Sequence, residues 1–148
     1  MVFRFSLQTL LRIRQSREQQ QELRLRATNQ RVAAVREEIA RIDQRIELGR
    51  TAQRHRLQTG TIAVELQFER LCAEVLGEHR VRMIKELALR EKHRDEERAR
   101  FEQLRRERET VEALRDRQLL LYQQESRRRE QRQLDDLFLL RHQYLRPR

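Results

Sequence analysis

Residues that could carry chemistry are few and scattered along the chain. The single cysteine and the four histidines do not fall at the spacing of a metal site: Cys72, His55, His79, His93 and His142. His93 and Glu97 are four residues apart and could share a cation, but two ligands on an exposed helix hold a metal weakly, so a solvated helix face is the favoured interpretation. No glycine-rich phosphate loop and no G-x-S-x-G motif occurs. We therefore predict no catalytic residue, no metal site, no cofactor and no small-molecule substrate, and we expect a protein that is not an enzyme.

Arginine dominates the charge of the chain. The net charge is +10, and lysine occurs only at Lys85 and Lys92. Such a chain can contact nucleic acid, anionic lipid or an acidic protein. The densest cluster, Arg127–Arg129, is followed by acidic residues and has few aromatic neighbours on which bases could stack. Nucleic-acid binding is therefore kept only as an alternative, and GC-rich codons would also explain the arginines.

The composition predicts that long helices position these residues. The 148 residues are 37% hydrophobic and 39% charged, against about 45–50% and 25% in a compact domain, which is too little for a thick core. Three glycines and one proline leave few turns. No apolar run approaches the ~20 residues of a membrane span, and early arginines interrupt any secretory signal. One cysteine excludes an intrachain disulfide framework. We expect an all-α cytoplasmic protein.

The first helix is predicted over about 7–56. Ser6 is a candidate N-cap, with Phe5 and Leu10 as a hydrophobic staple. Alternating spacings of three and four residues predict a coiled-coil seam at Leu25, Thr28, Val32, Val35, Ile39, Ile42 and Ile46. Extended toward the N-terminus, the seam turns polar, and we expect looser packing or a partner there: Leu11, Arg14, Glu18 and Gln21.

A turn at about 57–61 and a second helix at about 62–145, ended by Pro147, complete one predicted domain over 1–148. Gly49 is expected to fray the first helix, and Thr61 is a candidate N-cap of the second. The apolar residues of the second helix predict a seam whose register slips near Gly77–Arg82 and near Val111: Phe68, Cys72, Val75, Met83, Leu87, Phe101, Leu104, Val111, Leu114 and Leu121.

A short connection predicts an antiparallel two-helix coiled-coil hairpin whose second helix is the longer. Beyond about Gln118 that helix has no counterpart and carries the apolar stripe Leu134, Leu137, Phe138 and Leu145. An unpartnered apolar stripe indicates a binding surface. A membrane surface is an alternative weakened by Asp135 and Asp136, and a generic self-associating scaffold is another.

The N-terminal segment Phe3-Arg4-Phe5-Ser6-Leu7-Gln8-Thr9-Leu10-Leu11, followed by Arg14, resembles the start of the FliJ family, the coiled-coil stalk proteins of bacterial flagellar export. Type III secretion counterparts are similar. The resemblance implies a role in flagellum biogenesis, motility and protein transport. Implied partners are the export ATPase hexamer, the cytoplasmic domain of the export gate and export chaperones. The implied location is the cytoplasm, peripheral to the inner-membrane export apparatus and bound to it only through those partners.

The resemblance also implies two contact regions. Gln67-Phe68 followed by His79-Arg80 resembles the gate-contacting stretch, and its candidates are Phe68, Cys72, Val75, His79 and, on the first helix, Ile42. The alternative is that Phe68, Cys72 and Val75 belong to the intramolecular seam. By analogy with rotary stalks, the terminal region is expected to contact the ATPase ring through Leu7, Leu11, Arg14, Leu121, Tyr122, Arg127, Arg128, Arg129, Leu134 and Phe138.

Overall fold

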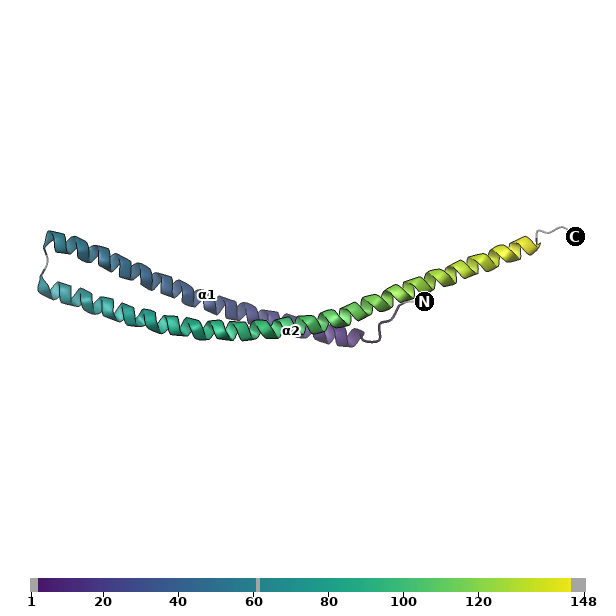
Figure 1. Cartoon of the computed structure of the whole chain (residues 1–148), viewed down its shortest axis with the longest axis horizontal. Helices are drawn as coiled ribbons and strands as arrows, with labels where there is room; N and C mark the ends of the chain where they lie inside the picture. Colours follow the sequence, from purple (N-terminus) through teal and green to yellow (C-terminus); the bar gives the residue numbers. More distant parts are fainter. Residues whose placement is uncertain (1–2, 61, 145–148) are drawn as a thin grey trace. The chain divides into compact units, whose positions relative to one another are not determined.

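The computed structural model describes residues 3–60 and 62–144 and consists of two long helices. Helix α1 spans Gln8–Thr59 and helix α2 spans Ala63–Tyr144, and the described residues contain no strand. Interhelical ion pairs join residues 93 positions apart near the start of α1 and 13 positions apart near its end, so the helices run antiparallel (Figure 1). The all-α hairpin with a longer second helix is confirmed.

The chain divides into two compact units. One is Gln19–Glu102, which contains the turn, and the other joins Met1–Glu18 to Gln103–Arg148. Each unit is built in the same way, because a stretch of α1 packs along a stretch of α2.

The start of α1 differs from the prediction by about one residue. The Leu7 carbonyl accepts the first α-helical hydrogen bond, from the Leu11 N–H at 3.0 Å. Leu7 rather than Ser6 therefore occupies the capping position. Phe5 and Leu11 are buried, whereas Leu10, the other member of the predicted staple, is exposed.

The reversal lies at Gly60, within the predicted turn at about 57–61. Gly60 has a φ of +89°, a conformation that glycine adopts at a helix C-terminus without steric cost. Helix α1 continues through Gly49 to Thr59, so the helix does not end where the fraying was expected to begin, although a glycine inside a helix costs about 1 kcal/mol. The candidate cap Thr61 and the predicted end of the second helix at 145 lie outside the described residues.

The predicted seam of α1 is confirmed along its whole length. Every predicted position, from Leu11 to Ile46, is buried or half-buried. Leu11 and Ile42 are each only 1% exposed. The polar positions are not left for a partner, because Arg14 pairs with Glu107, Glu18 with Arg108, and Gln21 with Glu97.

The predicted seam of α2 is correct at some positions and wrong at others. The buried and half-buried residues of α2 include one uninterrupted alternation of three and four residues: Leu76, Arg80, Met83, Leu87, Arg90, Arg94, Glu97, Phe101, Leu104, Arg108, Val111 and Arg115. The predicted register slips are therefore wrong, because charged residues fill the positions that apolar spacing misses. The remaining predicted residues are exposed: Phe68, Cys72, Val75, Leu114 and Leu121.

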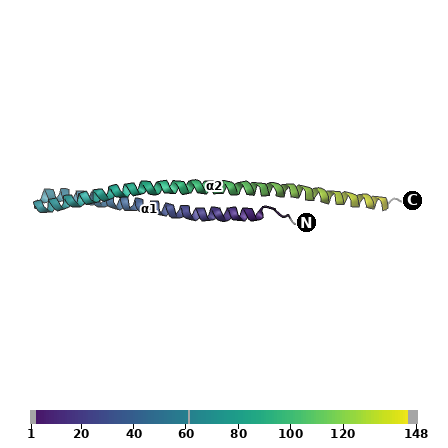
Figure 2. The ribbon, with the colours of Figure 1, turned by 90° about the horizontal axis from the view of Figure 1, so that it is seen from below.

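In the unit that contains the N-terminal segment, α2 extends beyond the start of α1 (Figure 2). Phe3, in the segment that precedes α1, contacts Tyr122 of α2, with ring centroids 5.6 Å apart. From residue 127 to 142 every residue is exposed. The expected single-helix extension therefore begins a few residues after the predicted Gln118.

Candidate functional site

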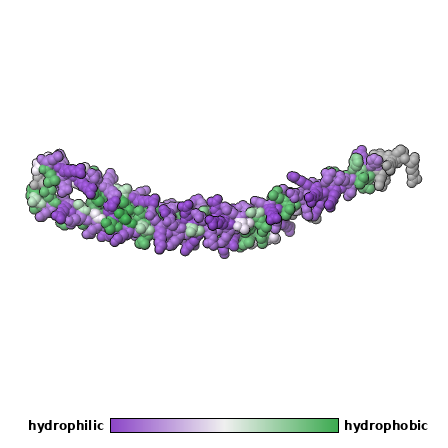
Figure 3. Space-filling view, viewed as in Figure 1, coloured by the Kyte–Doolittle hydropathy of each residue, from purple (hydrophilic) through white to green (hydrophobic). Residues whose placement is uncertain are grey.

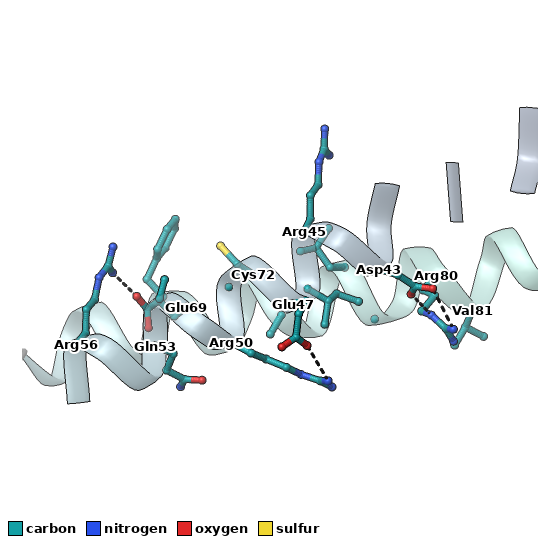
Figure 4. Close-up of a pocket in the computed structure, with 17 residues that line it drawn as sticks. Asp43, Arg45, Glu47, Arg50, Gln53, Arg56, Glu69, Cys72, Arg80 and Val81 are labelled. Atoms are coloured by element: carbon teal, nitrogen blue, oxygen red, sulfur yellow. Dashed lines mark hydrogen bonds and ion pairs between the residues drawn. The ribbon is translucent and has the colours of Figure 1, made fainter. Parts of the chain in front are cut away.

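The hairpin opens into a cleft of about 870 Å³ between α1 and α2 in the unit Gln19–Glu102 (Figure 4). Small residues of both helices line it, including Gly49 and Gly77. A Cβ added at either glycine would meet no atom within 4 Å. The cleft exists because no side chain at these positions spans the space between the helices.

Ion pairs close the ends of this cleft. Arg80 donates to Asp43 from Nε at 2.5 Å and from Nη2 at 3.4 Å. This hydrogen bonding, more than the Coulomb attraction, holds the pKa of Asp43 below its usual value and raises the pKa of Arg80. Toward the turn, Arg56 pairs with Glu69. The other carboxylate oxygen of Glu69 is enclosed and has no hydrogen-bond partner among the described residues.

The predicted gate-contact residues separate into an exposed group and a buried residue. Phe68 is 67% exposed and Val75 60%, and Cys72 is also exposed, so none of the three is buried in an intramolecular seam. Phe68 and Cys72 line the cleft. His79 is half-buried, with Nε2 3.9 Å from Glu38 Oε1, whereas Ile42 is enclosed in the seam.

Two further exposed residues extend this surface. Val64 and Leu71 lie on the same face of α2 as Phe68 and Val75, at spacings of four, three and four residues. We call Val64, Phe68, Leu71 and Val75 the α2 stripe. A periodicity search can find this alternation in the sequence, but it cannot tell whether such a stripe faces α1 or solvent.

The predicted ring-contact residues near the start of α1 are largely engaged within the hairpin. Leu11 is buried, Arg14 pairs with Glu107, and Tyr122 contacts Phe3. Leu7 and Leu121 remain exposed. Several side chains that were predicted to contact a partner therefore already contact other residues of this chain.

The other predicted ring-contact residues lie on the single-helix part of α2. Arg127, Arg128, Arg129, Leu134 and Phe138 are all exposed. Leu137, Leu139 and Leu140 are exposed as well, so residues 137–140 are apolar around most of the helix circumference. The space-filling view shows this apolar patch near the C-terminal end of α2, next to a strongly hydrophilic stretch (Figure 3).

The titratable groups singled out in the sequence are not gathered into a reactive site. Glu97 accepts hydrogen bonds from Gln21 and Arg100, while His93 Nδ1 lies 4.0 Å from Glu96. The cation interpretation of His93 and Glu97 thus gains no support. No cluster of three potential metal ligands occurs within residues 3–60 and 62–144. What the described surface offers is apolar and cationic contact area.

A family model described as "Flagellar FliJ protein" matches residues 3–146 of the chain. Comparisons with curated proteins and with solved structures gave no significant match.

Proposed function

Because the chain belongs to the FliJ family of flagellar proteins, we propose that it is a non-enzymatic stalk of the flagellar export apparatus. In this role it binds the export ATPase ring and the cytoplasmic domain of the export gate and assists the delivery of chaperones with their substrates. Membership makes the chain a flagellar export component. The observation that carries the finer proposal is the exposure of Phe68, Cys72 and Val75, which a self-sufficient hairpin would bury.

The cleft and the α2 stripe form the proposed gate contact. The cleft lies between the two helices, and on α1 it begins just after Ile42, which is buried in the seam. A partner side chain entering between Gly49 and Gly77 would bury apolar surface at roughly 25 cal/mol per Å². The stripe beside it supplies further apolar area.

The test of the gate contact is a pull-down with the purified cytoplasmic domain of the gate. Phe68→Ala with Val75→Ala removes two of the four residues of the α2 stripe, and Gly77→Leu fills the cleft without a clash at its Cβ. Both variants are expected to lose at least about tenfold in affinity, a size typical of interface anchors. Leu89→Ala, which is equally exposed elsewhere on α2, is the control. Retention of the gate domain by both variants would contradict the contact.

The single-helix part of α2 forms the proposed contact with the ATPase ring. A helix that is apolar on most sides is stable only when it is surrounded, and a ring encloses a helix on every side. Leu137→Ala with Phe138→Ala is expected to abolish capture of the chain by the ATPase hexamer while leaving thermal unfolding unchanged, because both residues are exposed. The proposal fails if capture persists.

The proposed location follows from these partners. Within the described residues, no helix is long and apolar enough to cross a membrane. The chain is proposed to act in the cytoplasm and to reach the inner membrane only through the gate. Fractionation of cells with and without the gate would test this location, since a chain that stays at the membrane without the gate would contradict it.

A further inference from the structure

Several exposed arginines on α1 make no ion pair with a described residue, and Arg24 and Arg31 are two of them. Arg24 and Arg31 stand one heptad apart, and neither makes an ion pair with any described residue, whereas Arg26 pairs with Glu22 at 2.6 Å and Arg36 with Glu91 at 2.5 Å. The residues three and four positions away from both arginines are uncharged: Gln20, Gln21, Ala27, Thr28, Ala34 and Val35. The chain therefore leaves these two cations unneutralised within α1.

Helix α2 does not neutralise them either. Glu38 of α1 faces His79 of α2 across the seam. Because the helices are antiparallel, moving seven residues back along α1 and seven residues forward along α2 places Arg31 opposite Glu86. Glu86 accepts a hydrogen bond from Arg90 at 2.7 Å. The next step places Arg24 opposite His93, which has no negative charge. The two guanidinium groups thus keep their positive potential toward solvent.

A column of uncharged residues, two of them alanines, borders the arginines on the solvent side of α1. Gln20, Ala27 and Ala34 repeat every seven residues and are exposed, and Leu23 beside them is 64% exposed. Short side chains allow a second helix to approach closely. We call Gln20, Arg24, Ala27, Arg31 and Ala34 the arginine face.

We propose that the arginine face binds an amphipathic helix of a partner protein whose acidic side chains repeat every seven residues. Seven residues rise about 10.5 Å along a helix, so carboxylates at this interval match Arg24 and Arg31 in turn, and arginine pairs with carboxylates in a bidentate geometry. A second copy of the chain fits poorly, because its net charge is +10. Nucleic acid also fits poorly, because residues 19–40 contain no aromatic side chain on which a base could stack. This surface is separate from the cleft and from the single-helix part of α2.

The test is a fluorescence-anisotropy titration of the full chain with two helical peptides of about four heptads. Both have the same composition, but one carries glutamate at every seventh position and the other carries the glutamates in scrambled order. The ordered peptide is expected to bind about tenfold more tightly at about 50 mM salt and to lose affinity at about 150 mM. Arg24→Gln with Arg31→Gln is expected to remove that advantage. Arg54→Gln with Arg82→Gln, an equal charge change at other exposed positions, leaves it intact.

A third variant tests whether binding depends on the arginine face itself and not only on the positive charge of the chain. Ala27→Glu sets a carboxylate three residues after Arg24 and four before Arg31, so it can pair with either arginine within the helix and halves the net charge of the pair. This variant is expected to abolish the preference for the ordered peptide while its thermal unfolding temperature stays the same or rises. Equal binding of both peptides, or equal loss in the two arginine pairs, would overturn the proposal. Tighter, Arg24- and Arg31-dependent binding of a short DNA duplex would overturn it in favour of nucleic acid.

Discussion

Gln21 of α1 donates through Nε2 to the backbone carbonyl of Glu97 of α2 at 3.1 Å, and also to the Glu97 side chain, inside the seam. Both residues are only 5% exposed. A polar pair at seam positions fixes the register of two helices, because a shifted pairing would leave both groups buried without partners. Gln21→Ala is therefore expected to cost about 1–3 kcal/mol of unfolding free energy, measured by urea denaturation followed by circular dichroism.

The matched control is the double variant Gln21→Leu with Glu97→Leu. Replacing both partners by apolar groups is expected to recover most of the lost stability. If the double variant is less stable than Gln21→Ala, the register argument is wrong.

The ion pair between Arg14 and Glu107 gives a second prediction, in the other unit of the chain. Both side chains are about one-third exposed, so solvent screens the pair and its net contribution is about 1 kcal/mol or less. Arg14→Glu is expected to lower stability by about that amount, since it places two carboxylates together. The charge swap Arg14→Glu with Glu107→Arg restores part of it. Equal stability of the single and swapped variants in thermal melts at low salt would contradict the pairing.

How far the seam follows from the sequence depends on which residues occupy it. On α1, residues such as Val32, Val35 and Ile39 establish the period, and extending it through Glu18 gave the correct polar positions. On α2, arginines at Arg80, Arg90 and Arg94 fill the seam, where their apolar stems pack and their charged ends reach out. A search for apolar spacing cannot recognise such positions, and it therefore assigned off-seam residues such as Phe68 to the seam.

The candidate surfaces were predictable only in part, for the same reason. The exposure of Leu134 and Phe138 follows from helix length alone, because α2 is 82 residues long and α1 only 52. The cleft follows from the absence of side chains at Gly49 and Gly77, and the sequence does not show that these two glycines line the same space. Burial of Ile42 and Leu11 depends on which face of each helix turns inward.

The three glycines give a third prediction, because their surroundings differ. Gly49 and Gly77 lie inside helices with open space at the Cβ position, so alanine at either is expected to raise stability by about 0.5–1 kcal/mol. Gly60 has a positive φ, and alanine there is expected to destabilise by about 1 kcal/mol. Urea denaturation of the three single variants checks both signs, and a stabilising Gly60→Ala would show that the turn does not need this conformation.

The pair Asp43 and Arg80 predicts a specific titration. Its hydrogen bonds lower the pKa of Asp43 in the folded state, so the pair stabilises the hairpin above the unfolded carboxyl pKa of about 3.9. That stability is lost as the pH falls through the lower, folded-state pKa. Carbon-detected NMR titration of the Asp43 carboxyl is expected to give a pKa below the unfolded value. Arg80→Gln is expected to return it toward that value, while Arg82→Gln, at an exposed neighbouring position, leaves it lowered. An Asp43 pKa unchanged by Arg80→Gln would show that the guanidinium group is not its cause.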